Sequence, residues 1–324
     1  MPKRVILQPA GKEFVVEQHE TILEAGLRHG LNLPYSCANG TCGDCRSRLL
    51  AGSIEPVRYH DFRLTPGERQ QGWFLTCSCR PLTDLEISLD LSDRPGDIPQ
   101  QRIATRVSKT VPLNREILLL ELRTPRSRSF RFLAGQKARL TFGDCFSVIL
   151  PVASCPCDGI HLRFHLRTAG AGPGECWREL LKHGQRVTVQ GPCGEFVMDE
   201  TSKRPLLFIA WDTGFAQIQS LVEHAISIDP DRIMRLYWLS PEAHGHYLSN
   251  YCRSLEDALD DFSYRPVGLA SITHLDDVIA QILETCSLQE YDLYMTLPHA
   301  CMTHSRQRIL ELGVPEQHLF IDSA

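Results

Sequence analysis

Four cysteines in the first quarter of the chain have the spacing needed to hold an iron–sulfur cluster. Cys37, Cys42 and Cys45 form a C-x4-C-x2-C pattern within YSCANGTCGDC, and Cys77 follows inside FLTCSCRP. This is the plant-type ligand pattern of a [2Fe-2S] cluster, a cofactor that moves single electrons. Structural zinc sites usually pair two short Cys-x2-Cys knuckles, so one tight loop joined by a distant cysteine favours the cluster over zinc.

Other cysteine and histidine groups carry weaker signals. Cys155-Pro156-Cys157 resembles a redox pair, but adjacent-but-one cysteines around a proline are expected to be poorly placed for a disulfide. His244-Gly245-His246 has no acidic or thiol neighbour in the sequence that would complete a metal site. We identify no nucleophile–base group, and therefore no catalytic residue.

The composition is that of a globular chain with more than one domain. It has 324 residues, of which 43% are hydrophobic, a length that allows two or three domains with real cores. A net charge of −5 gives no indication of a nucleic-acid partner. No apolar run is long enough for a signal peptide or a membrane span, so a reducing, cytoplasmic setting is expected. Cysteines outside the cluster set are then interpreted as small buried hydrophobes or incidental thiols, rather than as a disulfide framework.

The elements that must position the cysteines divide the chain into three units. In the first, residues 1–95, we expect the strands Arg4–Gln8 and Glu13–Glu17, a helix opened by a capping box at Thr21–Glu24 and ended by Gly30, and the strand Leu85–Leu89. This β-β-α order around the cysteine loop suits a small β-grasp ferredoxin. Residues 93–101, DRPGDIPQQ, indicate a linker.

The second and third units differ in their periodicity. Residues 102–198 are rich in strands such as Ile117–Arg123 and Ile160–Arg167, with one short helix near Cys176–Lys182, which predicts a six-stranded antiparallel barrel. Residues 203–324 alternate strands with helices, which predicts a parallel, doubly wound α/β sheet. The expected elements there are Leu206–Trp211, Phe215–Ala225, Ile233–Ser240, Leu275–Cys286, Asp292–Leu297 and Met302–Leu312. The fold class is therefore α+β and multidomain.

Three sequence motifs, together with this layout, indicate a resemblance to a known family. They are FLAGQ at 132–136, GPCGEF at 191–196 and TGFA at 213–216. With the cysteine loop, they make the whole chain resemble bacterial NAD(P)H-dependent reductases of the ferredoxin–NADP reductase superfamily that carry an N-terminal plant-type ferredoxin. Reductases of oxygenases and of the CDP-6-deoxy-glucoseen type are the most similar. The resemblance implies hydride transfer from a nicotinamide to FAD, and then single electrons passing to the cluster and on to a partner protein. Its register also implies that Cys77 is the fourth ligand and that Cys79 is a packed neighbour.

The flavin-binding strand departs from the family pattern. The family carries R-x-Y-S followed by a small-residue pair, and here Val148, Leu150 and Pro151 stand at the Arg, Tyr and Ser positions. Valine cannot form a charge-assisted phosphate clamp, and proline removes a backbone donor. Cys176 stands where the family's pyrophosphate loop has a hydroxyl. The alternative is that Arg139, Arg163, Arg167 or Ser147 bind the cofactor instead.

The nucleotide-binding segments depart in the same way. The family turn A-G-G-T-G has become Ala210 followed by Trp211, Asp212, Thr213 and Gly214. This change adds bulk and negative charge where phosphates would lie. Gln217 replaces a proline, and the family's C-G-x-P reads Thr296-Leu297-Pro298-His299. The chain ends without a terminal aromatic residue, although Phe320 lies near the end.

These observations lead to one main hypothesis and two alternatives. The main hypothesis is an electron-transfer protein whose [2Fe-2S] cluster feeds a redox partner such as an oxygenase, with ordinary FAD and NAD(P)H chemistry weakened or lost. The first alternative is a complete NAD(P)H-dependent FAD/[2Fe-2S] reductase with an altered pocket. The second is a non-redox assembly subunit with a structural cluster. The sequence leaves open whether the chain is itself an enzyme.

Overall fold

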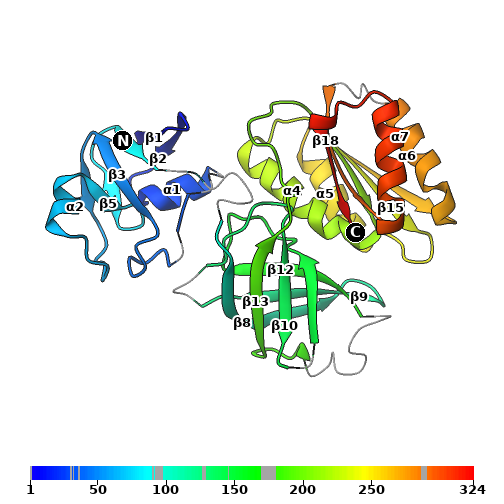
Figure 1. The fold of residues 1–324 in the computed structure, drawn as a ribbon, viewed down its shortest axis with the longest axis horizontal. Helices are drawn as coiled ribbons and strands as arrows, with labels where there is room; N and C mark the ends of the chain where they lie inside the picture. The colour runs from blue at the N-terminus through cyan, green and yellow to red at the C-terminus, as the bar shows by residue number, and fades with distance from the viewer. Residues whose placement is uncertain are drawn as a thin grey trace.

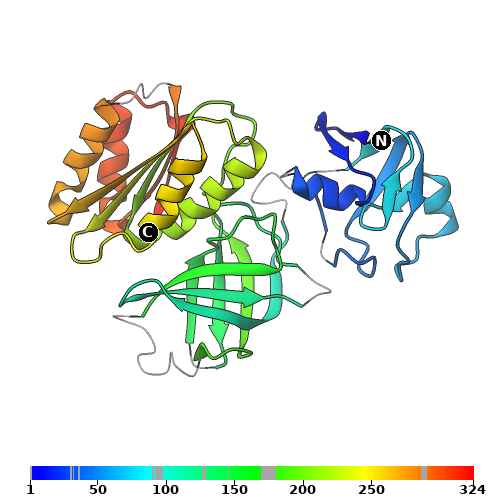
Figure 2. The same ribbon diagram turned by 180° about the vertical axis from the view of Figure 1, so that it is seen from behind.

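Three main β-sheets follow one another along the chain in the computed structural model, which describes residues 2–324 except 30, 32, 36, 90, 92–97, 126–128, 145, 169–179 and 286–289. The N-terminal sheet lies to one side, and the antiparallel barrel packs below the C-terminal parallel sheet (Figure 1). The view from behind shows the same arrangement (Figure 2). In the described part of the chain, no helix combines the length and apolar character needed to cross a bilayer.

The N-terminal sheet has the strand order β2-β1-β7-β3-β5, in which β1 and β7 are parallel and the other pairs antiparallel. Its elements are β1 Lys3–Gln8, β2 Lys12–Val16, α1 Ile22–Arg28, β3 Arg46–Ala51, β5 Trp73–Leu75 and β7 Leu85–Ser88; the helix α2 Pro66–Gln70 and a small sheet of β4 Ile54–Pro56 and β6 Cys79–Pro81 lie beside it. The capping box predicted at Thr21 and Glu24 forms in both directions, which fixes the start of α1 over the sheet.

The second sheet is a six-stranded antiparallel barrel with the order β11-β10-β13-β8-β9-β12. Its strands are β8 Gln101–Pro112, β9 Ile117–Arg123, β10 Lys137–Phe142, β11 Phe146–Pro151, β12 His161–Arg167 and β13 Arg186–Cys193. Alternate residues of these strands face the interior, as in β8, whose buried positions recur at every second residue over its first half. The barrel closes where the Ala153 amide donates to the Arg163 carbonyl at 2.7 Å.

The third sheet is parallel, with the order β16-β15-β14-β17-β18. Its strands are β14 Leu206–Trp211, β15 Met234–Pro241, β16 Phe262–Leu269, β17 Asp292–Leu297 and β18 Leu319–Ser323, and its helices are α4 Phe215–Ile228, α5 Ser249–Ala258, α6 Leu275–Glu284 and α7 Met302–Glu311. Every residue of β14 and β17 is buried, because separate apolar clusters cover the two faces of the sheet.

The two barrel motifs of the sequence meet in space. The Gln136 side chain donates to the Gly194 carbonyl at 3.1 Å, which ties the FLAGQ segment to the GPCGEF segment. Gly135 adopts a φ of 92°, and a Cβ added to it would lie 2.3 Å from the Phe196 carbonyl oxygen. Only glycine satisfies both conditions, so the motif glycine is required by backbone packing.

The predicted fold class is confirmed: a ferredoxin-type sheet, an antiparallel barrel and a parallel α/β layer follow one another in the expected order. The strands predicted at Ile117–Arg123, Leu206–Trp211 and Asp292–Leu297 have the predicted bounds. Several predictions lie outside the described residues, namely the helix stop at Gly30, the linker over 93–97, the start of the helix near Cys176 and the Cys176 hydroxyl replacement.

Replacing Gly135 with alanine tests the close approach between the two barrel motifs. We expect Gly135→Ala to lower the thermal unfolding midpoint by more than Gly143→Ala does. Gly143 is also left-handed, with a φ of 57°, but a Cβ there meets nothing within 4 Å. The control should cost about 1–2 kcal/mol for the left-handed backbone alone. Equal shifts in the two variants would show that the Phe196 contact does not constrain position 135.

Candidate functional site

The loop that carries the first three cysteines has an unusual backbone. Ala38, Gly40 and Gly43 all have positive φ values, of 53°, 83° and 82°. A Cβ on Gly43 would lie 2.2 Å from the Phe62 ring, and one on Gly40 would lie 2.4 Å from the His60 Cβ. The two glycines therefore let the loop turn tightly beneath the 57–62 segment, as the chemistry of a cluster loop requires.

The structure brings the cysteine sulfurs together as two pairs. The Cys37 and Cys42 sulfurs are 3.2 Å apart, and so are those of Cys45 and Cys77. The backbone N–H groups of Thr41 and Cys42 donate to the Cys37 sulfur at 3.3 and 3.4 Å, and that of Asp44 donates to the Cys42 sulfur at 3.4 Å. In the described part of the chain, no three His, Cys, Asp or Glu side chains form a closed group able to hold a metal ion. The chemistry of four thiols in a nest of N–H donors nevertheless fits an anionic cluster.

Hydrogen bonds lower the pKa of two of the four sulfurs, those of Cys37 and Cys77, whereas burial raises the pKa of Cys42. Burial raises the pKa of Cys37, but hydrogen bonds from Thr41 and neighbouring groups outweigh it and lower the pKa to about 7. The hydrogen bond with Cys45 lowers the pKa of Cys77 to about 6, and that same bond raises the pKa of Cys45. Cys79 differs, because burial raises its pKa to about 11. The Cys77 sulfur is also the one that contacts Cys45, which places it with the cysteines of the loop.

The cysteine loop abuts the barrel. Tyr35, two residues before Cys37, is buried, and its side chain is hydrogen-bonded to Ser129 at the barrel surface; burial raises its pKa. Arg131 follows on the same barrel segment, where the charge of Asp44 acts on it. An open cleft of about 460 Å³ runs between the loop and the barrel, lined by Gly43, Asp44, Arg46, Trp73, Pro99, Gln100, Gln101 and Arg131. The thiol site therefore lies next to the barrel.

The departures in the flavin strand fall on β11. Val148 and Leu150 pack against the apolar core of the barrel, and Pro151 ends the strand. Arg139 pairs with the exposed Ile149, so it lies on the opposite face of the strand from Val148 and Leu150. Arg139 therefore cannot replace the missing arginine directly, and Ser147 bonds to Thr141 instead.

The remaining cations near this strand are already engaged by acidic groups. Arg163 pairs with Glu223 at 2.6 Å, and Arg167 pairs with Glu116 at 2.8 Å. Lys137, which lies opposite Pro151, contacts Asp322 at 3.2 Å and the Ser323 carbonyl at 2.9 Å. At these three positions of β11 the side chains differ from the family pattern, and the alternative cations Arg163 and Arg167 are ion-paired.

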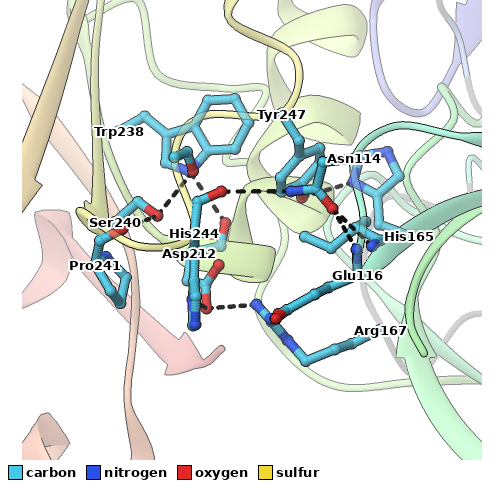
Figure 3. Close-up of polar contacts among 12 residues, drawn as sticks. Asn114, Glu116, His165, Arg167, Asp212, Trp238, Ser240, Pro241, His244 and Tyr247 are labelled. Atoms are coloured by element: carbon cyan, nitrogen blue, oxygen red, sulfur yellow. Dashed lines mark hydrogen bonds and ion pairs between the residues drawn. The ribbon is translucent and has the colours of Figure 1, made fainter. Parts of the chain in front are cut away.

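The nucleotide turn keeps a left-handed backbone conformation, which is typical of glycine, at a position where this chain has Asp212. Asp212 has a φ of 47°, a left-handed conformation that its short side chain tolerates. Its carboxylate is 2.6 Å from the Arg167 guanidinium and 3.0 Å from the His244 ring, and its carbonyl accepts from the Trp238 indole at 3.0 Å (Figure 3). The other carboxylate oxygen of Asp212, Oδ1, is buried without a hydrogen-bond partner among the described residues. A carboxylate thus occupies the turn, where the Arg167 ion pair and the contact with the His244 ring hold it.

Aromatic residues pack around the same turn. The Trp238 and Phe215 rings stack with centroids 3.8 Å apart, and Tyr247 meets Trp238 edge-on. His165, completely buried, lies 3.0 Å from the Tyr247 hydroxyl, and burial lowers its pKa to about 3 (Figure 3). His165 is therefore neutral at physiological pH, and it joins the barrel to the α/β sheet without adding charge.

The remaining segments named in the sequence have structural contacts. Trp211 donates from its backbone to the Thr296 hydroxyl at 3.3 Å, so the altered turn packs directly on the altered C-G-x-P segment. The His244 ring faces Asp212, and the His246 ring donates to the Trp238 carbonyl at 2.7 Å, so the two histidines do not converge. Phe320 stacks on Tyr294 with centroids 4.4 Å apart.

Sequence reasoning missed a thiol site in the barrel. The prediction that Cys155 and Cys157 are poorly placed for a disulfide is wrong, because the structure joins them by one, with Cα atoms 5.3 Å apart. A tight turn, in which the Asp158 amide donates to the Cys155 carbonyl, brings the two residues together. His224 lies 3.9 Å from the Cys155 sulfur, and Glu200 lies 3.0 Å from the other side of the His224 ring, a cluster that the sequence analysis did not identify. Only the C-x-C pattern itself signalled this site.

Removing Arg167 tests whether the ion pairs stabilise the altered turn. In Arg167→Met the Asp212 carboxylate keeps His244 but loses its closest cation, so we expect unfolding to become easier by about 1–3 kcal/mol. The control is Arg265→Met, which removes a surface ion pair with Glu256 and should cost about 0–1 kcal/mol. Thermal unfolding of both variants provides the measurement. A loss no larger than that of the control would mean that Asp212 does not depend on Arg167.

Comparison with known proteins places these features in context. Residues 5–82 match the family described as "2Fe-2S iron-sulfur cluster binding domain". The "CDP-6-deoxy-L-threo-D-glycero-4-hexulose-3-dehydrase reductase" of Yersinia pestis is 27% identical, with 100% of this chain and 98% of that protein covered. The "Propane 2-monooxygenase, reductase component" of a Gordonia species is also 27% identical, with 98% and 96% covered.

Solved structures show the same architecture over the full length. The ferredoxin reductase in carbazole 1,9a-dioxygenase superposes with a TM-score of 0.59 at 22% identity, and the match covers 100% of this chain and 99% of that one. Together with the match of residues 5–82, this similarity fits the three-sheet architecture described above. Residues 5–82 thus match a 2Fe-2S cluster-binding domain, and the whole chain shares its fold with the ferredoxin reductase of a dioxygenase system.

Proposed function

We propose that the chain is the reductase component of a redox system, delivering single electrons from its N-terminal domain to a partner enzyme. The observation that carries this proposal is the position of the cysteine loop, which sits against the barrel through Tyr35 and Ser129. Full-length relatives named as reductases of a dehydrase and of a monooxygenase support the same function. The partner is accordingly proposed to be an oxygenase or a dehydrase, and the domain limits to be 1–95, 102–198 and 203–324.

We assign the cluster to Cys37, Cys42, Cys45 and Cys77. The first three cysteines lie on a loop with positive φ values, and backbone N–H groups from residues 41, 42 and 44 donate to the sulfurs of Cys37 and Cys42. When bound, a [2Fe-2S] cluster supplies one-electron transfer. The protein contributes the thiolates, the N–H donors that stabilise their negative charge, and the cover formed by His60 and Phe62 over the two loop glycines.

For the electron source, we propose the complete form of the reductase, in which NAD(P)H reduces a flavin held by the body. The support is that both layers of the body are intact and that the reductases named above align with nearly the whole chain. A flavin, when bound, converts a hydride into single electrons. The family's contact residues do not fit it here, since Val148, Leu150 and Pro151 offer no cation or hydroxyl. Any flavin would therefore be held by groups outside this motif.

A second function is favoured by one specific observation. Asp212 occupies the left-handed position of the nucleotide turn and pairs there with Arg167 and His244. An anionic side chain at this point repels a pyrophosphate. In this second function the body serves as a scaffold that docks the cluster domain, and electrons reach the cluster from another protein.

Substituting a proposed ligand tests the cluster assignment. Cys42→Ser should lose the visible absorption of the cluster and most of its iron and sulfide, because one of four thiolate ligands is gone. Cys79→Ser is the matched control: this thiol is buried beside the site, and its loss should leave the spectrum and the iron content unchanged. A normal spectrum in Cys42→Ser, or a lost one in Cys79→Ser, would overturn the ligand set. Wild-type protein whose cluster dithionite cannot reduce would overturn the electron-transfer function and support a structural cluster.

Restoring the family residues on β11 tests the electron source. We expect purified wild-type protein to bind FAD weakly and its absorbance to bleach with NAD(P)H. The triple variant Val148→Arg, Leu150→Tyr and Pro151→Ser should bind FAD about tenfold more tightly, as one charge-assisted phosphate contact provides.

The control for this experiment places an arginine on the wrong face of the same strand. Ile149→Arg adds equal charge on the exposed side and should leave FAD affinity, measured by fluorescence titration, unchanged. Wild-type protein that neither binds FAD nor responds to NAD(P)H, together with a triple variant that gains nothing, would reject the complete reductase and leave the scaffold function.

A further inference from the structure

The Cys155–Cys157 disulfide has one buried and one exposed end. Cys155 is 7% exposed, whereas Cys157 lies on the protein surface at the tip of the same turn. The Cys155 backbone is held in place, because its amide donates to Glu223 at 3.2 Å and the preceding Ser154 carbonyl accepts from Ser220 at 2.8 Å. Both partners belong to α4. A small reagent can therefore reach one sulfur, while the other is fixed behind it.

A histidine and a carboxylate stand behind the buried sulfur. The His224 Nδ1 atom lies 3.9 Å from the Cys155 sulfur, and its Nε2 atom lies 3.0 Å from Glu200. Burial raises the pKa of Glu200, but the hydrogen bonds with His224 and Lys12 and the charge of Lys12 outweigh it, so the pKa is lowered and the group is ionised. A carboxylate only accepts, so Nε2 carries a proton in its bond to Glu200, and Nδ1 is the ring nitrogen that faces the Cys155 sulfur. Once the disulfide is reduced, the Cys155 thiol therefore lies beside an imidazole nitrogen, the arrangement of a thiol and a general base.

The same group reaches the N-terminal domain. Glu200 also pairs with Lys12 of β2 at 3.1 Å. Beside it, a cavity of about 20 Å³ is lined from the body by Pro156, Cys157 and His224, and from the N-terminal domain by Leu27, Leu31, Leu33 and Tyr35. The cysteine pair thus forms part of the surface on which the cluster domain rests.

We propose that Cys155 and Cys157 form a reversible thiol–disulfide site that adjusts the docking of the cluster domain. The co-reactant is a small-molecule disulfide of the glutathione class. In the forward direction the Cys157 thiolate attacks this disulfide, forming a mixed disulfide and releasing one thiolate. The Cys155 thiol then gives its proton to His224 Nδ1 and attacks the Cys157 sulfur, and the second small thiol leaves. Overall, two protein thiols and one small disulfide become one protein disulfide and two small thiols.

The thiol–disulfide exchange affects docking because the 155–157 turn has one conformation when the two sulfurs are bonded and another when they are not. Reduction releases Pro156 and Cys157 from the tight turn, and these residues line the cavity shared with the N-terminal domain. Disulfides in a reducing compartment, the setting that the sequence predicts, are generally transient and regulatory. The site is independent of the electron source discussed above.

Redox titration of the full-length holoprotein tests the site. The protein is equilibrated with glutathione at graded ratios of oxidised to reduced form, then quenched with acid and alkylated. Mass spectrometry then measures the mass of the peptide that contains residues 155–157. We expect it to change from doubly alkylated to unalkylated as the ratio rises. Cys155→Ser should trap glutathione on Cys157, and Cys301→Ser, a partly exposed thiol elsewhere, should leave the titration unchanged. A pair that stays in one state at every ratio, or a Cys155→Ser variant that collects no glutathione, would overturn the site.

Crosslinking measures the effect on docking. A carbodiimide joins Lys12 to Glu200 without a spacer, so its yield reports their contact in solution. We expect the yield to fall when the disulfide is reduced, and to stay low in oxidising buffer for the double variant Cys155→Ser, Cys157→Ser. Equal yields in both redox states would overturn the link to docking and leave a redox pair with no effect on the cluster domain.

Discussion

Several of the polar contacts that fix the body of the molecule come from one helix, α4. Gln217, Ser220 and His224 lie on one face of this helix at helical spacing and are almost fully buried. Gln217 and Ser220 donate to carbonyls of the barrel, and His224 bonds to Glu200 in the segment that joins the barrel to the parallel sheet. Buried polar groups must be paired, so these bonds fix how α4 is rotated and seated on the barrel. The altered turn at Asp212, just before the helix, and the cysteine pair near its far end are positioned by the same contacts.

The departures from the family pattern are consistent with one another because each forms an internal contact. Asp212 pairs with Arg167 across the interface between the barrel and the α/β sheet. Gln217, which stands where the family has proline, bonds to Gly135 and to Asp322, and Asp322 in turn pairs with Lys137. Residues that could face a cofactor instead connect the two layers. A cofactor entering this interface must therefore compete with ion pairs, each of which is partly shielded from water.

The sequence pattern predicted those helices and strands whose structure depends on neighbouring residues. The strand Leu206–Trp211 was predictable to the residue because a parallel strand buried on both faces needs a continuous apolar run. The helix Ser249–Ala258 was missed, since Cys252 is its only fully buried residue and its apolar signal is correspondingly weak. Contacts between distant segments were not accessible: Cys155 and His224 are 69 positions apart, and only the seating of α4 on the barrel brings them together. The cluster cysteines were recognisable because their spacing is itself the signal.

The described contacts between the cluster domain and the body differ in strength. Tyr35 contributes a buried aromatic ring hydrogen-bonded to Ser129, which places the cysteine loop against the barrel. On the other side, the Lys12–Glu200 ion pair is partly exposed, and pairs of this kind contribute about 0–1 kcal/mol. Interfaces of this type allow domains to move unless they are large and apolar. A small change in the 155–157 turn therefore acts where the interface is weakest, while the contact next to the cluster loop can persist.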